Sequence, residues 1–117
     1  MAELVLYHNP RCAKSREALR LLTQAGHTPR VIHYLETPPN QTALKDLLKK
    51  LGRGPRDILR RGEPAYKELG LDDPALSDAS LVRTMVKHPI LIERPILISG
   101  RRAVVGRPPE AVLGLVK

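Results

Sequence analysis

The chain has few of the residues that build disulfide frameworks or base-stacking surfaces. Among its 117 residues there is one cysteine, Cys12, and the aromatic residues are three tyrosines, with no phenylalanine or tryptophan. A single cysteine excludes an internal disulfide and a cysteine-rich zinc site, and it favours the reducing cytoplasm as the location. Scarce aromatic residues argue against a stacking platform for single-stranded nucleic acid.

Long apolar runs are also missing. No stretch approaches the roughly 18 apolar residues that a transmembrane helix needs, and the chain shows no signal-peptide pattern. Hydrophobic residues make up 42% and charged residues 27%, which predicts one globular domain over residues 1–117. The net charge of +8 indicates anionic partners, but charge alone does not distinguish nucleic acid, acidic proteins and small oxyanions.

The pattern of apolar residues predicts a mixed α/β chain with a helical segment in its middle. The predicted strands are residues 4–7, 31–35, 96–98 and 103–105. The predicted helices are residues 14–24, 41–51, 55–60, 78–88 and 110–116, with turns over 63–74. The first helix joins two strands, so a β-α-β unit with parallel strands is expected. An all-helical insert at about 40–88 and a β-β-α unit follow.

Cys12 follows a predicted strand and loop and stands at the start of a predicted helix. A helix N-terminus presents unpaired N–H groups and the positive end of the helix dipole, and both stabilise a thiolate. Nearby residues can add positive charge or hydrogen bonds to the sulfur: His8, Arg11, Lys14, Ser15 and Arg16. The alternative is an inert cysteine that packs as a small hydrophobic residue. The basic, polar surroundings favour a reactive one.

Spacing excludes several other kinds of site. Ser15 stands where a C-x-x-C motif would have its second cysteine, so the chain holds no internal dithiol. Position 18 is alanine, which excludes the C-x5-R loop that binds phosphate. The four histidines lack zinc-ligand spacing, and no GxGxxG or Walker-type loop is present. We therefore expect no bound metal or organic cofactor.

Arginine outnumbers lysine by thirteen to seven. The arginine side chain is a rigid fork that fits tetrahedral oxyanions, which lysine does not. Three arginines stand at boundaries of predicted elements: Arg60, Arg94 and Arg107. Most arginines simply form a solvated basic surface, and we place seven others in that class: Arg11, Arg20, Arg30, Arg53, Arg83, Arg101 and Arg102.

Six sequence segments carry a likeness to a known family. They are Tyr7-His8-Asn9-Pro10-Arg11-Cys12 with Ser15-Arg16, Tyr34-Leu35-Glu36-Thr37-Pro38-Pro39, Leu59-Arg60-Arg61, Tyr66-Lys67-Glu68-Leu69-Gly70-Leu71, His88-Pro89-Ile90-Leu91-Ile92-Glu93-Arg94-Pro95-Ile96 and Gly106-Arg107-Pro108-Pro109-Glu110. In this order, and over essentially the whole chain, they resemble the glutathione/glutaredoxin-coupled arsenate reductase family, ArsC.

The resemblance implies a thioredoxin/glutaredoxin-like α/β fold, β-α-β and β-β-α around the central helical insert. It implies that Cys12 is the nucleophile that reduces arsenate to arsenite. It further implies that Arg60, Arg94 and Arg107 bind the oxyanion. His8, Ser15 and Arg16 would support the thiolate. Glutathione as co-substrate and glutaredoxin would supply the remaining thiols. By analogy with thioredoxin-like folds, Pro95 would be a cis-proline.

One departure from the family concerns the two residues after the cysteine. Well-studied arsenate reductases carry Gly-Thr where this chain has Ala13-Lys14, which places it in an arsenate-reductase-like subgroup. Two alternatives stay open: a thiol oxidoreductase of the same fold that acts on another substrate, and a regulator similar to the Spx-type proteins that bind RNA polymerase. Spx-type proteins typically carry a C-x-x-C switch. We expect no specific nucleic-acid or membrane binding.

Overall fold

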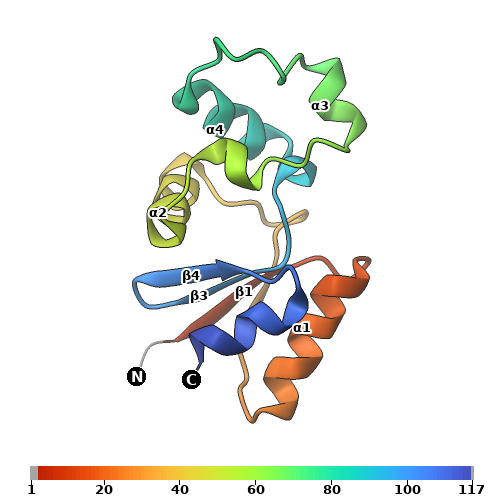
Figure 1. Ribbon diagram of the computed structural model, residues 1–117, viewed down its shortest axis with the longest axis vertical. Helices are drawn as coiled ribbons and strands as arrows, with labels where there is room; N and C mark the ends of the chain where they lie inside the picture. The colour runs from red at the N-terminus through yellow and green to blue at the C-terminus, as the bar shows by residue number, and fades with distance from the viewer. Residues whose placement is uncertain (1–2, 117) are drawn as a thin grey trace. The chain divides into compact units, whose positions relative to one another are not determined.

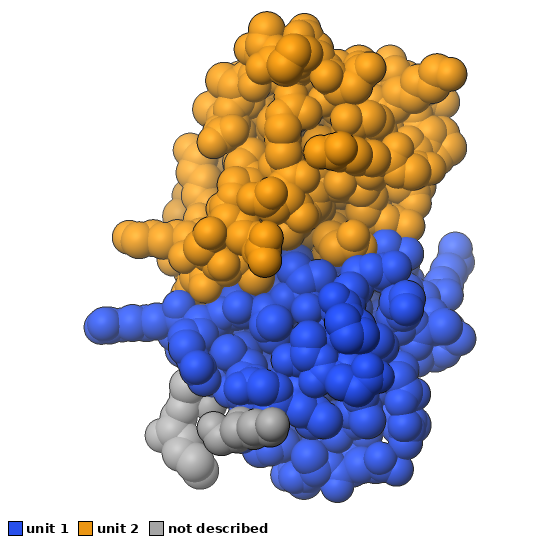
Figure 2. All heavy atoms as spheres, viewed as in Figure 1, with its two compact units in different colours: residues 1–37, 94–117 blue, residues 38–93 orange. Residues whose placement is uncertain are grey.

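A computed structural model describes residues 3–116. These residues group into two compact units (Figure 2): one from the two ends of the chain, up to Thr37 and from Arg94 onward, and one from its middle, Pro38–Glu93. The middle unit contains the segment expected as a helical insert at about 40–88. The expectation of a single domain over 1–117 stays a prediction. Within residues 3–116, no helix has the length and apolar character that a membrane span requires.

The terminal unit contains a four-stranded sheet with the strand order β2-β1-β3-β4 (Figure 1). The strands are β1 (Leu4–His8), β2 (Arg30–His33), β3 (Ile96–Ser99) and β4 (Arg102–Val105). β1 pairs in parallel with β2 and antiparallel with β3, and β3 and β4 form a hairpin. The parallel pair results from the crossover through α1 (Ala13–Gln24), because a helix that returns the chain to the same edge makes the next strand parallel.

One apolar cluster joins the sheet to α1 and to the C-terminal 3₁₀ helix η3 (Pro109–Leu115). Its buried members come from β1, β3 and the two helices: Leu6, Ala18, Leu22, Leu97 and Val112. Ala18 and Leu22 are four residues apart and so lie on the same face of α1. The carboxyl end of β1 is thereby anchored, and the loop that follows it starts from a rigid strand.

The middle unit is helical. It contains α2 (Gln41–Leu51), η1 (Pro55–Ile58), α3 (Pro64–Glu68), α4 (Asp78–Lys87) and η2 (Pro89–Leu91). The Asn40 side chain accepts from the Ala43 N–H at 2.8 Å and caps α2, which ends at Gly52 in the left-handed conformation. Ser77 caps α4 in the same way as Asn40 caps α2. Buried leucines of α2 and the buried residues of α4 make the apolar interior.

The structure differs from the sequence-based expectation at several elements. Residues 55–58 form a 3₁₀ helix where a helix over 55–60 was expected, and residues 89–91 form a 3₁₀ helix that was not expected. Residues 64–68 form a short helix where turns were expected, since Pro64 begins a helical turn that the Leu69 N–H closes on the Ala65 carbonyl. β2 ends at His33, because the His33 carbonyl then accepts from the N–H groups of a turn. The last helix is 3₁₀, with an Ala111 N–H bond to the Pro108 carbonyl, three residues earlier.

Candidate active site

Cys12 stands at the junction between the β1 loop and α1. Its backbone is extended (φ −95°, ψ 122°), and its carbonyl accepts the first helical bond, from the Arg16 N–H at 3.0 Å. The Cys12 N–H donates to the Asn9 carbonyl at 3.0 Å, and the Asn9 side-chain oxygen accepts from the Arg11 N–H at 3.0 Å. These two bonds close a tight turn that fixes Cys12 as the N-cap residue of α1.

A buried polar network supports this turn. The hydroxyl of Ser15, which is fully buried, lies 2.6 Å from His8 Nδ1 and accepts from the Asn9 N–H at 3.0 Å. His8 is 4% exposed. Burial lowers the pKa of His8, and the nearby charges of His33 and Arg16 lower it further. A neutral His8 can therefore accept a hydrogen bond from the Ser15 hydroxyl.

The environment of the sulfur lowers the pKa of Cys12. Partial burial acts in the opposite direction and raises it, but four other contributions outweigh burial. They are the backbone N–H of Ser15, the positive charge of Arg94, the backbone N–H of Lys14 and a hydrogen bond from the Arg94 side chain. The Ser15 group that acts on the sulfur is its backbone N–H, because its hydroxyl is engaged by His8 and Asn9. The site thus favours a thiolate.

Arg94 and Arg107 are held together by the loops before β3 and after β4. The Arg107 guanidinium donates to the Arg94 carbonyl at 3.4 Å, and the Gly106 N–H donates to the Pro95 carbonyl at 2.8 Å. The Arg94–Pro95 and Arg107–Pro108 peptide bonds are both cis. A Cβ atom on Gly106 would lie 2.7 Å from Pro95 Cγ, so only glycine allows this close approach.

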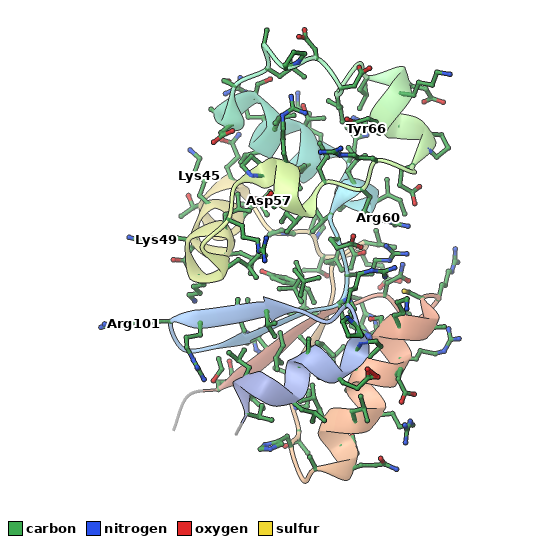
Figure 3. The ribbon with its side chains drawn as sticks, in the orientation of Figure 1. Lys45, Lys49, Asp57, Arg60, Tyr66 and Arg101 are labelled. Carbon is green, nitrogen blue, oxygen red and sulfur yellow. The ribbon has the colours of Figure 1, made fainter. Side chains whose placement is uncertain are left out.

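The remaining residues expected at the site have different surroundings. The Arg16 guanidinium donates to the Pro10 carbonyl at 2.9 Å, so Arg16 fastens the loop before the cysteine. Arg60, labelled in Figure 3, belongs to the middle unit. It pairs with Glu63 at 2.7 Å and donates to the Ile90 carbonyl at 3.2 Å. Its placement beside the cysteine stays a prediction. Cys12, Arg94 and Arg107 all lie in the terminal unit, and the roles expected of them at one site stay predictions.

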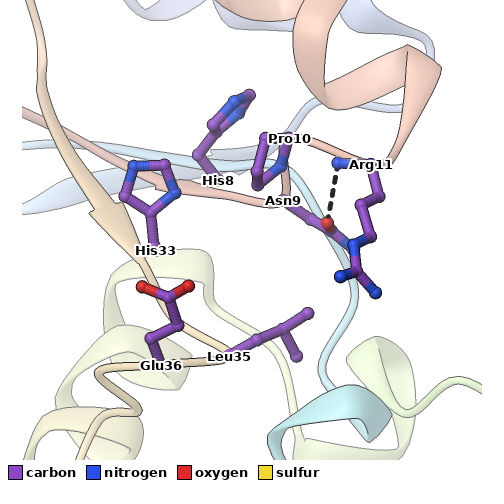
Figure 4. Close-up of a pocket in the computed structure, with 7 residues that line it drawn as sticks. All are labelled: His8, Asn9, Pro10, Arg11, His33, Leu35 and Glu36. Atoms are coloured by element: carbon purple, nitrogen blue, oxygen red, sulfur yellow. Dashed lines mark hydrogen bonds between the residues drawn. The ribbon is translucent and has the colours of Figure 1, made fainter.

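Sequence reasoning missed two residues beside the loop, Asn9 and His33. The His33 ring packs edge-on against the His8 ring, with centroids 5.8 Å apart. The signal for this contact was the β-α-β pattern, because parallel pairing brings His8 opposite His33. Asn9 and His33 line a pocket of about 210 Å³ beside the cysteine loop (Figure 4). Within residues 3–116, His, Cys, Asp and Glu side chains form no group of three or more that could hold a metal ion.

Comparison with known proteins identifies the family. The model of the ArsC family matches residues 7–115. The chain is 50% identical to the uncharacterized protein YfgD of Escherichia coli (strain K12), over 97% of each chain. It is 47% identical to an arsenate reductase of Neisseria meningitidis serogroup A, over 96% of this chain and 97% of the relative. The structure of the arsenate reductase from Vibrio cholerae superposes with a TM-score of 0.94, at 50% identity and 97% coverage of both chains. The chain therefore has a thioredoxin-like α/β fold and belongs to the ArsC family.

Proposed function

We propose that this chain is an oxidoreductase that reduces arsenate to arsenite, with Cys12 as the nucleophile. The observation that carries the proposal is the position of Cys12 at the start of α1, where backbone N–H groups and Arg94 lower its pKa. A thiolate is the reactive form of cysteine, and the lowered pKa of Cys12 increases the share of it. Similarity to proteins named arsenate reductase supports the choice of arsenate.

The first chemical step is attack of the Cys12 thiolate on arsenic. A new sulfur–arsenic bond forms, and an arsenate oxygen leaves as water after protonation. Arsenate and the thiolate are both anions at neutral pH, so the reaction needs cations that offset their repulsion and stabilise the developing charge. We assign this role to Arg94 and Arg107, which are linked by a hydrogen bond from the Arg107 guanidinium to the Arg94 carbonyl. We assign it also to Arg60 of the middle unit.

The electrons come from thiols outside the chain. Reduction of arsenate to arsenite takes two electrons, which two thiols supply when they are oxidised to one disulfide, with release of one water. The single cysteine of this chain cannot supply both. We propose glutathione as co-substrate and glutaredoxin as the protein that regenerates the free Cys12 thiol. This chemistry suits the cytoplasm, where thiols stay reduced.

We assign His8, Ser15 and Arg16 a positioning role. The Ser15 hydroxyl joins the end of β1 to the loop through His8 and the Asn9 N–H. Arg16 holds the Pro10 carbonyl. Together they keep the turn that presents the Cys12 sulfur to the N–H groups of the helix, which supports the thiolate without direct contact by their polar side-chain atoms.

A second candidate is a thiol-dependent reductase of the same fold with a different substrate. Lys14 favours it, because this exposed side chain adds a charge in the first turn of α1, directly after the cysteine. A regulator of the Spx type is less consistent with the site. Ser15, at the position of a second redox cysteine, is buried and hydrogen-bonded to His8.

The test is arsenate-dependent oxidation of NADPH, coupled through glutaredoxin, glutathione and glutathione reductase. Wild type should turn over, and Cys12→Ser should be inactive while it remains folded. Arg94→Ala and Arg107→Ala should reduce kcat/KM for arsenate more than Arg101→Ala does, because Arg101 is exposed at the β3–β4 turn (Figure 3). Equal losses in all three variants contradict the arginine assignment, and no turnover by reduced wild type favours the second candidate.

A further inference from the structure

The pocket beside the cysteine loop has no role in the function proposed above. It lies where β1 and β2 end, and its lining comes from the last residue of each strand, the loop after β1 and the turn after β2. Because β1 and β2 are parallel, both segments emerge at the same end of the sheet. The lining is Pro10 and Leu35 on the apolar side, with His8, Asn9, Arg11, His33 and Glu36 as polar groups.

Two opposite charges border this pocket. Figure 4 shows the Glu36 carboxylate on the side of His33, the Arg11 guanidinium on the other side, and Leu35 between them. Both charged side chains are exposed, and among residues 3–116 neither forms an ion pair or a side-chain hydrogen bond. The two do not pair with each other across the pocket. Each can therefore bind a charged group of a ligand without breaking a bond within the protein.

The size and charge of the pocket restrict the ligand. Its volume of about 210 Å³ is below the roughly 300–1,000 Å³ of pockets that enclose whole drug-sized ligands, so it fits one end of a molecule. A simple oxyanion would pair with Arg11 but would be repelled by Glu36. A zwitterion satisfies both, with an ammonium group at Glu36 and a carboxylate at Arg11. The α-amino-acid group carries these two charges on one carbon.

The position of the pocket indicates what the rest of the ligand does. Arg11 directly precedes Cys12, and the Asn9 carbonyl accepts from the Cys12 N–H. A ligand anchored here would lie beside the loop that carries the sulfur. The Arg94 and Arg107 groups belong to the loops that flank β3 and β4, on the other side of β1 from β2. The pocket and the Arg94–Arg107 pair thus lie on opposite sides of the cysteine loop.

We propose that this pocket binds the α-ammonium and α-carboxylate groups of a thiol peptide, so that its sulfur reaches the adduct on Cys12. The inference rests on the proposed function in one respect, the use of glutathione as co-substrate. It adds that Glu36 and Arg11 determine the affinity for the amino-acid end of that thiol. Oxyanion binding by the arginines does not depend on them.

A binding experiment tests the pocket without turnover. S-methylglutathione, which has no free thiol, is titrated into reduced wild-type protein and followed by backbone amide chemical shifts. We expect saturable shifts at Asn9, Arg11 and Glu36. Glu36→Gln and Arg11→Gln should each weaken binding by roughly two- to fivefold, the loss of one exposed charge pair. Glu68→Gln, an exposed glutamate of the middle unit, is the matched control and should bind like wild type.

A second probe removes one charge from the ligand. N-acetyl-S-methylglutathione lacks the ammonium group, so it should bind wild type more weakly than S-methylglutathione does, and it should bind Glu36→Gln and wild type equally. Unchanged affinity in Glu36→Gln, or shifts confined to the cis-Pro95 side, overturns the inference. If the probe binds as expected and arsenate turnover is absent, the pocket stands and the proposed function fails. If turnover occurs with the same KM for glutathione in Glu36→Gln, the function stands and the pocket assignment fails.

Discussion

Gly106→Ala should destabilise the protein because the loop after β4 packs directly on cis-Pro95. A Cβ atom at this position would lie 2.7 Å from Pro95 Cγ and 3.1 Å from Val112 Cγ1. Carbon atoms pack best at about 3.5–4.0 Å, so the closer contact is too short by roughly 1 Å. The Pro95 ring cannot rotate away as a flexible side chain could, and its carbonyl is held by the Gly106 N–H at 2.8 Å. The backbone must therefore move.

Overpacking of this kind costs about 1–3 kcal/mol in the free energy of unfolding. At about 4 °C for each kcal/mol in a domain of this size, Tm falls by about 4–12 °C. The assay is thermal and urea unfolding of the wild type and Gly106→Ala. The displacement also moves the Arg94 carbonyl and the Arg107 guanidinium, so we expect kcat/KM for arsenate to fall as well.

Gly114→Ala is the matched control in the adjacent 3₁₀ helix. Its Cβ meets nothing within 4 Å, and its backbone needs no positive φ. Loss of chain entropy in the unfolded state should make it neutral or more stable by up to about 1 kcal/mol. Equal Tm values for the Gly106→Ala and Gly114→Ala variants would refute the packing argument, because the two substitutions differ in the contacts of the new methyl group.

Three further predictions concern the cysteine and its supporting network. The midpoint of Cys12 alkylation by iodoacetamide should lie at lower pH than that of an ordinary cysteine, and Arg94→Ala should move it to higher pH, since a cation near the sulfur is lost. Ser15→Ala should cost about 1–3 kcal/mol in urea unfolding, because a buried hydroxyl with two partners is removed. The free energy of unfolding should fall as pH decreases through 6.5, the ordinary pKa of histidine. His8 is protonated there in the unfolded chain, whereas burial lowers its pKa in the folded protein and keeps it neutral to lower pH. His8→Asn, which keeps an acceptor near the Nδ1 position, should reduce that slope in urea titrations at about pH 7.5 and about pH 5.5.

Each of these predictions has a result that contradicts it. An alkylation midpoint that is the same in Arg94→Ala and wild type shows that the Arg94 charge does not act on the sulfur. A Ser15→Ala variant as stable as wild type shows that the buried hydroxyl contributes no net stability. A pH slope that is unchanged in His8→Asn assigns the proton uptake to other groups.

The fold class and the helix that presents the cysteine could be predicted from local sequence patterns. Apolar spacing and the β-α-β order predicted the sheet strands and α1, since periodicity and crossover geometry are local properties of the chain. The position of Cys12 before α1 predicted a stabilised thiolate, because backbone N–H groups are always available at a helix start. The family motifs pointed to Arg94 and Arg107, which the structure places together.

Which side chains meet across the sheet could not be predicted from local patterns, because it depends on strand register and on how the loops pack. The His8–His33 contact depends on the register of β1 against β2, and the close approach of Gly106 to Pro95 depends on the register of the β3–β4 hairpin that these two residues flank. The Ser15 hydroxyl was expected to bond to the sulfur. In the structure it instead bonds to the His8 ring and to the Asn9 N–H, which are buried beside it. Likewise the sequence placed Arg11 among the solvated surface arginines and gave Glu36 no role beyond its place in a family motif. The two border one pocket because parallel strands end at the same edge of the sheet.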